Sequence, residues 1–134
     1  MIGREPEACT IVFNRGVEII TSQIRQKLIE NFDINQERQD RGETEIDHWP
    51  VVKIFTPDGG CTWLLTELNP ENEMAFGLCD LGLGYPEVGA VSLDDLRRTR
   101  GALGLPVERD LHFEATKSLM DYALESLKAE RIIV

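Results

Sequence analysis

The clearest hydrophobic pattern lies in the middle of the chain, where three runs rich in β-forming residues are separated by turn sequences. The runs are Trp49–Thr56, Cys61–Leu68 and Met74–Leu81. Between the first two lies the sequence PDGG, in which Pro restricts φ, Asp can hydrogen-bond its own backbone and Gly allows positive φ. Short connections of this kind predict an antiparallel meander.

Alternation within this meander assigns side chains to faces, because successive residues of a strand point to opposite sides. One face of the second strand is predicted to carry Trp63, Leu65 and Glu67. One face of the third strand is predicted to carry Ala75, Gly77 and Cys79. If the register brings these faces together, large side chains lie over small ones, which fills space well. The run Val88–Val91 is predicted to add an edge strand.

Segments with a helical period flank the meander. Before it, apolar residues recur every four positions behind a capping Thr or Ser, which predicts a helix over Ser22–Phe32. The polar stretch 33–48 cannot bury enough apolar surface to be core, so a solvated connector is predicted there. After the meander, Ser92 caps a predicted short helix that runs to about Arg100. At the N-terminus, Thr10–Ile20 is predicted to form a hairpin.

A final helix is predicted near the C-terminus, with Ser118 as its cap. Its apolar positions recur at three- and four-residue spacing, which is typical of a helix that buries one face. The predicted buried stripe consists of Leu119, Ala123 and Leu127, widened by Met120 and Leu124.

The predicted strand Leu105–Phe113 carries the most informative local pattern. Alternation places on one face Glu108, Asp110 and His112. These residues form either a metal or acid–base site or a face that simply meets solvent, and the solvent-facing interpretation is favoured. Arg109 falls on the opposite, apolar face, where a buried guanidinium has to be paired. We therefore predict a structural ion pair of Arg109 with Glu67 or Asp80.

The composition fits one α+β domain over residues 1–134, with residues 1–18 as an N-terminal extension. We expect an antiparallel sheet of four to five strands with helices packed mainly on one face. The chain has 24 acidic and 14 basic residues and a net charge of −10. This charge disfavours binding to nucleic acid and to anionic membranes. It serves either solubility, which is the favoured interpretation, or the binding of a partner protein with a basic surface. Three cysteines without CxxC spacing, and no evident signal peptide, predict a cytoplasmic location.

No motif identifies an active site, a metal site or a cofactor, so catalytic residues are left unassigned. The glycine-rich loop 82–89 lacks the spacing of a phosphate-binding loop. Tyr85 in this loop is an exposed aromatic beside acidic residues, which is typical of an interface anchor. The candidate interaction or pocket residues are Glu67, Asp80, Tyr85, Glu87, Glu108, Arg109 and Asp110.

Three runs together give the chain a family resemblance: VVKIFTPDGGCTWLLTEL, MAFGLCDLGLGYPEVGAVSLDDL and GLPVERDLHF. Over about Ile19 to Ala123 the chain resembles the bacterial family catalogued as domain of unknown function 2958. The resemblance implies a setting on plasmids and integrative elements, and it supplies no catalytic residues. The matching positions are Trp63, Glu67, Asp80, Gly82, Pro86, Glu87, Glu108, Arg109 and Asp110.

Two functional hypotheses follow. The first is a non-enzymatic accessory factor of a mobile genetic element that binds a host or element-encoded protein with a basic surface. An anti-defence protein of the anti-restriction or anti-CRISPR type is one form of it. The alternative is a small enzyme or ligand-binding domain with a pocket lined by carboxylates and Arg109. Convergence of these groups on a cavity would favour the alternative.

Overall fold

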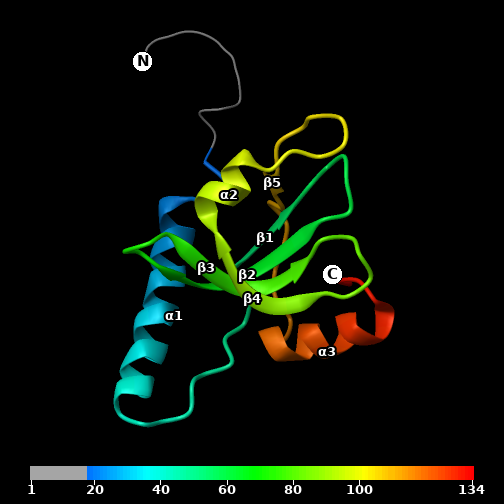
Figure 1. Ribbon diagram of the computed structural model, residues 1–134. Coiled ribbons are helices and arrows are strands. Elements are labelled where there is room, and N and C mark those ends of the chain that lie inside the picture. Colours follow the sequence, from blue (N-terminus) through cyan, green and yellow to red (C-terminus); the bar gives the residue numbers. More distant parts are fainter. Residues whose placement is uncertain (1–17) are drawn as a thin grey trace, which may run out of the picture.

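The computed structural model describes residues 18–134 as an open five-stranded antiparallel sheet with three helices (Figure 1). The strand order is β4-β3-β2-β1-β5. The elements are α1 (Ser22–Asp40), β1 (Val52–Phe55), β2 (Thr62–Asn69), β3 (Met74–Asp80), β4 (Glu87–Ser92), α2 (Leu93–Arg98), β5 (Glu108–Arg109) and α3 (Leu119–Ala129). The predicted α+β class and the meander are confirmed, and β4 is the predicted extra strand. Residues 10–17 of the predicted hairpin, and the predicted extension up to residue 17, lie outside the described residues.

Apolar side chains form two buried clusters, one on each face of the sheet. Leu64 and Leu65 are neighbours on β2 and therefore point to opposite faces. Leu65 belongs to the larger cluster, which also contains Trp63 and residues of α1 and α2. Leu64 belongs to the smaller cluster, with Leu78 and with Tyr122 of α3. The helices α1 and α2 thus cover one face of the sheet, and α3 packs against the other face.

The first helix is longer than predicted. It runs to Asp40 and includes the first half of the stretch that was predicted to be a connector. Its later turns are held by Asn35, which is 3% exposed. The Asn35 side chain donates to the C=O of Ile46 and accepts from the N–H of Ile46. Because the buried position in these turns is an asparagine, the apolar periodicity could not reveal that the helix continues.

The register between β2 and β3 confirms part of the predicted face pairing and corrects the rest. The paired residues are Trp63 with Cys79, Leu65 with Gly77, and Leu68 with Ala75. The register shifts between Leu65 and Glu67, as a β-bulge with one extra residue on β2 requires. Leu68 therefore shares the buried face with Leu65. The prediction that Glu67 lies on this face was wrong.

The predicted strand Leu105–Phe113 is mostly irregular. Only Glu108 and Arg109 form β5, which pairs with β1. Asp110 then accepts a hydrogen bond from the N–H of His112, a local turn contact. The N–H of Asp110 still donates to the C=O of Lys53, so Asp110 shares a face with Glu108 as predicted. The chain turns at His112, so the prediction that His112 lies on this face was wrong.

The last helix begins where predicted but buries a different side. The Ser118 hydroxyl accepts a hydrogen bond from the N–H of Asp121. The buried residues of α3 are Leu119, Tyr122 and Ser126. Leu124 and Leu127, which were predicted to be buried, are 59% and 65% exposed. Tyr122 takes the central position because its hydroxyl can still accept a hydrogen bond, here from the N–H of Thr116.

Candidate functional site

The predicted site residues lie in three separate parts of the sheet. They are Glu67 on β2; Asp80, Tyr85 and Glu87 around the β3–β4 turn; and Glu108, Arg109 and Asp110 on and just after β5. Asp80 pairs with Thr62, five residues along β2 from Glu67. At about 3.3 Å per residue, Glu67 and Asp80 are roughly 15 Å apart along the strand. The carboxylates therefore do not line one common pocket.

Glu67 is held by α1 and not by Arg109. The Asn35 side-chain amide donates to Glu67 Oε2 at 2.8 Å. Burial raises the pKa of Glu67, the hydrogen bond from Asn35 opposes this shift, and the nearby carboxylate of Glu45 adds to it. Glu67 is thus a polar link between α1 and β2 whose charged form is disfavoured.

We expect Glu67→Gln to raise the melting temperature by a few degrees at pH 7.5. The pKa of Glu67 is higher in the folded state, so its contribution to stability is fully present below the unfolded pKa and is lost as pH rises through the folded pKa. A glutamine keeps an acceptor for Asn35 without the charge. Thermal unfolding followed by circular dichroism at pH 7.5 and pH 4 measures the difference, which should vanish at the lower pH.

Glu108→Gln provides the matched control, because Glu108 is an exposed carboxylate on β5. The control should melt like the wild type at both pH values. A Glu67→Gln protein that melts below the wild type at pH 7.5 would show instead that the charged form of Glu67 stabilises the fold.

Asp80 is buried and joins two backbone segments. Its Oδ1 accepts from the N–H of Gly82 at 2.8 Å, and its Oδ2 accepts from the N–H of Ile132 at 3.0 Å. The first bond closes the start of the β3–β4 turn, and the second holds the C-terminal tail beside it. In the adjacent Cys79, burial raises the thiol pKa to about 11, and the Glu87 carboxylate adds to the shift. Such a thiol is protonated at neutral pH and is not an activated nucleophile.

Arg109 does not pair with Glu67 or Asp80, so the predicted ion pair was wrong. Its guanidinium donates to the C=O of Ile19 at 3.0 Å and to the C=O of Glu18 at 3.3 Å. These bonds fasten the segment before α1 to the edge strand β5. Backbone carbonyls carry no sequence signature, so residue types alone could not identify them as the partners.

Asp110 has structural partners at the same edge. Its carboxylate lies 3.4 Å from Lys53 Nζ on β1. The hydrogen bond from the His112 backbone lowers the pKa of Asp110, and Lys53 lowers it further. Asp110 therefore stabilises the junction of β1 with the chain after β5.

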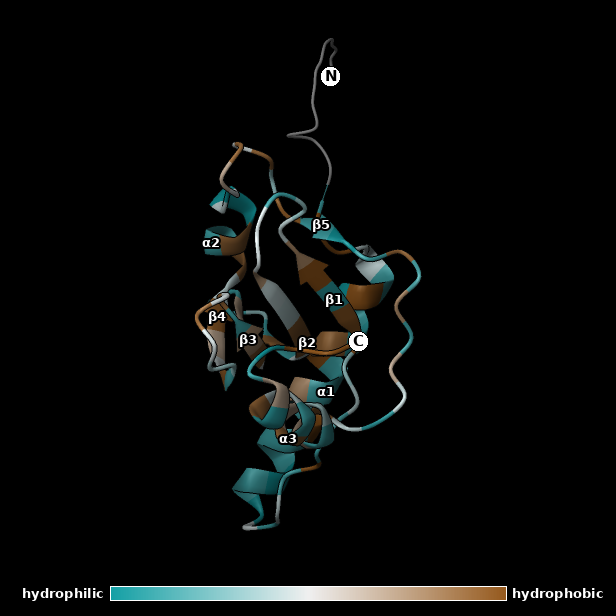
Figure 2. Cartoon of the chain, turned by 90° about the vertical axis from the view of Figure 1, so that its right-hand side faces the viewer, coloured by the Kyte–Doolittle hydropathy of each residue, from teal (hydrophilic) through white to brown (hydrophobic). Residues whose placement is uncertain are grey.

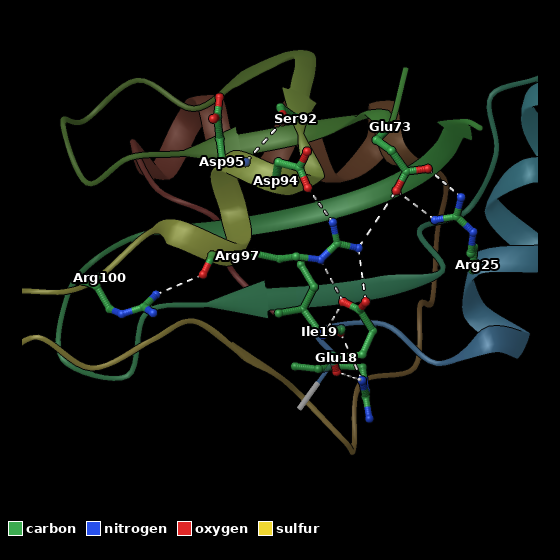
Figure 3. Close-up of polar contacts among 10 residues, drawn as sticks. Glu18, Ile19, Arg25, Glu73, Ser92, Asp94, Asp95, Arg97 and Arg100 are labelled. Atoms are coloured by element: carbon green, nitrogen blue, oxygen red, sulfur yellow. Dashed lines mark hydrogen bonds and ion pairs between the residues drawn. The ribbon is translucent and has the colours of Figure 1, made fainter. Parts of the chain in front are cut away.

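A charge network that the sequence did not predict centres on Arg97 of α2 (Figure 3). Arg97 lies 3.1 Å from Glu18, 2.8 Å from Asp94 and 3.9 Å from Glu73. Arg25 of α1 donates both of its terminal nitrogens to Glu73, at 3.0 and 2.5 Å, which lowers the pKa of Glu73. Arg25 and Glu73 are 48 positions apart, so sequence spacing gives no sign of the pair. The network ties together α1, the β2–β3 turn and α2.

The surface of α3 carries apolar side chains that no contact within the described residues explains. We call Met120, Leu124 and Leu127 the α3 outer face; they are 47%, 59% and 65% exposed. Their spacing places them on one side of the helix. Figure 2 shows apolar positions on α3, and the C-terminus lies close to this helix. The sequence already indicated this exposed apolar face, because α3 has more apolar positions than a single buried stripe needs.

Charge is unevenly distributed along the chain. From Ile54 to Leu96 there is no lysine, arginine or histidine. The acidic residues of this acidic segment are Asp58, Glu67, Glu71, Glu73, Asp80, Glu87, Asp94 and Asp95. Arginines from outside the segment pair with three of them: Arg25 with Glu73, Arg97 with Asp94 and Arg98 with Asp95. Glu71, in the β2–β3 turn, and Glu87, at the start of β4, are exposed carboxylates of this segment.

The fold and surface define a small α+β protein with an exposed apolar helix face and an acidic segment without basic residues. Residues 19–133 match the family described as "Protein of unknown function (DUF2958)", and the chain belongs to that family. No curated protein and no solved structure matches the chain. Within residues 18–134, no helix is long and apolar enough to cross a membrane, and no group of three or more His, Cys, Asp or Glu side chains could hold a metal ion.

Proposed function

We propose that the chain is a non-enzymatic accessory factor that binds a partner protein with a basic surface in the cytoplasm. The observation that carries this proposal is the α3 outer face. Burying a leucine side chain is worth about 1.5–3 kcal/mol, and contiguous apolar patches on soluble proteins mark interaction sites. Met120, Leu124 and Leu127 face away from the sheet that buries the other side of α3.

Charge supports a basic partner. The net charge of −10 attracts a cationic surface at long range and speeds its association. The acidic segment has no basic residue of its own and contributes the exposed carboxylates Glu71 and Glu87. In this proposal the α3 outer face supplies most of the binding affinity, and the negative charge of the chain orients the basic partner as it approaches.

The alternative, an enzyme or ligand-binding domain with a carboxylate pocket, has less support. It requires Glu67, Asp80 and Arg109 to converge. Asn35 holds Glu67, two backbone N–H groups hold Asp80, and Arg109 donates to backbone carbonyls. These groups already have structural partners.

The mobile-element setting comes from the family resemblance and is part of the proposal. One form of this proposal is an anti-defence role of the anti-restriction or anti-CRISPR type. In that role a small acidic protein occupies a basic surface on a host protein. The identity of the bound partner tests this setting directly.

Affinity capture from the host bacterium, with the tagged full chain as bait, tests the proposed function. We expect the wild type to retain a partner that salt releases, and the double variant Leu124→Lys, Leu127→Lys to retain at least about tenfold less, a factor of ten being 1.4 kcal/mol. Both side chains are exposed, so the double variant should keep the circular dichroism spectrum of the wild type.

Leu103→Lys is the matched control, because Leu103 is 81% exposed on the loop between α2 and β5, away from α3 (Figure 1). The control should retain as much partner as the wild type. If the double variant captures the same proteins in the same amounts as the wild type, the proposed function is contradicted. A captured restriction or CRISPR component would support the anti-defence form.

A further inference from the structure

Among the described residues, nothing pairs with or covers the outer edge of β4. β4 is an end strand of the sheet, and within residues 18–134 no other strand pairs with its outer side (Figure 2). It is six residues long and reads EVGAVS, with one carboxylate and no lysine, arginine or proline. Soluble proteins usually protect sheet edges with such residues, with bulges or with very short strands. The opposite edge follows this rule, because β5 has two residues.

The register shows which backbone groups of β4 are free. Just beyond the paired strands, the N–H of Leu93 donates to the C=O of Glu73 at 3.0 Å, directly across the β3–β4 ladder. Bonded and non-bonded pairs alternate in antiparallel strands. Residues 91, 89 and 87 therefore bond to β3. Val88 and Ala90 direct their N–H and C=O groups outward, where they can bond an added strand.

The side chains beside these groups differ on the two faces of the sheet. Val88 and Ala90 lie opposite Leu78 and Phe76 of β3, so all four share one face. Phe76 is 39% exposed and Val88 is 36% exposed, so this apolar face reaches the edge. Glu87 lies on the other face and is exposed. An added strand would therefore meet apolar side chains on one face and a carboxylate on the other.

We infer that the outer edge of β4 binds an extended segment of the partner protein, in which basic residues alternate with apolar ones. This inference rests on the proposed function and states how the partner is recognised: main-chain hydrogen bonds give affinity, and alternate side chains give specificity. The occupant is basic because β4 lies within the acidic segment and carries the exposed Glu87. A second copy of the chain would bring two acidic segments together, each from a chain of net charge −10.

Binding of a fluorescent octapeptide of alternating lysine and valine to the full chain tests this inference. We expect saturable binding that weakens with salt, no binding of the matching glutamate–valine octapeptide, and slower hydrogen exchange at the amides of Val88 and Ala90 in the complex. Val88→Pro should weaken binding by at least about tenfold. It should leave the fold intact, because this N–H points away from the sheet. Val88→Thr keeps the N–H and should bind within about twofold of the wild type.

Several results would overturn the edge site. They are no binding of the lysine–valine peptide, binding without added protection of Val88 and Ala90, equal binding by Val88→Pro, and amides already protected in the free protein. A dimer in sedimentation that Val88→Pro dissociates would assign the edge to a second copy. If partner capture survives Val88→Pro and is lost with the two leucine changes on α3, the protein-binding function stands and the edge site fails. If capture is unchanged by the α3 changes, the proposed function itself fails.

Discussion

Gly77→Ala is expected to destabilise the protein by about 3 kcal/mol or more, because the added Cβ atom would clash with backbone atoms of β2. A Cβ atom at position 77 would lie 1.9 Å from the carbonyl oxygen of Leu64, and 2.9 Å from the Leu64 carbonyl carbon and from Leu65 Cα. These atoms belong to β2 at the start of its register shift. They cannot move without breaking the pairing of β2 with β3. Urea unfolding followed by tryptophan fluorescence measures the loss.

Gly89→Ala is a matched control for this prediction. Gly89 is the direct cross-strand partner of Gly77, but a Cβ at position 89 would meet no atom within 4 Å. The control should therefore stay within about 0.5 kcal/mol of the wild type. If Gly77→Ala and Gly89→Ala unfold at the same urea concentration, the close approach of β2 and β3 at the bulge is contradicted.

Asp80→Ala is expected to cost about 3–5 kcal/mol and to lower the melting temperature by about 10 °C or more. Asp80 is 4% exposed, and each carboxylate oxygen accepts a backbone N–H, from Gly82 and from Ile132. Alanine would leave both donors without an acceptor in a buried site. We expect the C-terminal tail to detach, which faster hydrogen exchange at the Ile132 amide would report alongside thermal unfolding.

Two further variants sharpen this prediction. Asp80→Asn keeps one acceptor oxygen but turns a donor toward the second N–H, so its loss of stability should be intermediate. Asp95→Ala removes an exposed carboxylate that pairs with Arg98 and should change stability by no more than about 1 kcal/mol. An Asp80→Ala protein that melts like Asp95→Ala would show that Asp80 is not structural and would return it to the list of candidate binding residues.

Predictions from the sequence succeeded where the deciding interactions are local. The turn sequence between β1 and β2, and the caps Ser92 and Ser118, depend on contacts within a few residues, and each lies where it was predicted. Alternation also predicted that Leu65 and Gly77 pair across the two strands, as they do. These features follow from backbone chemistry that each segment carries with it.

The candidate site residues were recognised as unusual, but their partners were not. Burial of Asp80 and the partial burial of Glu67 agree with their positions on central strands, yet the partners are Ile132 and Asn35. Both contacts join positions more than 30 residues apart, 52 and 32 respectively. Only the packed fold brings such groups together, because each partner is one of many equivalent donors in the chain.

The sequence by itself determined the α+β class, the antiparallel meander and the starts of the later helices, since propensity, capping and alternation act over short stretches of chain. The tertiary structure alone decided the bulge that moves Glu67 off the core face, the side of α3 that is buried, and the free edge of β4. A bulge depends on how two paired strands fit together. A helix with two apolar sides buries the side that packs better against the sheet. A strand edge is free only where no neighbouring strand pairs with it, here among residues 18–134.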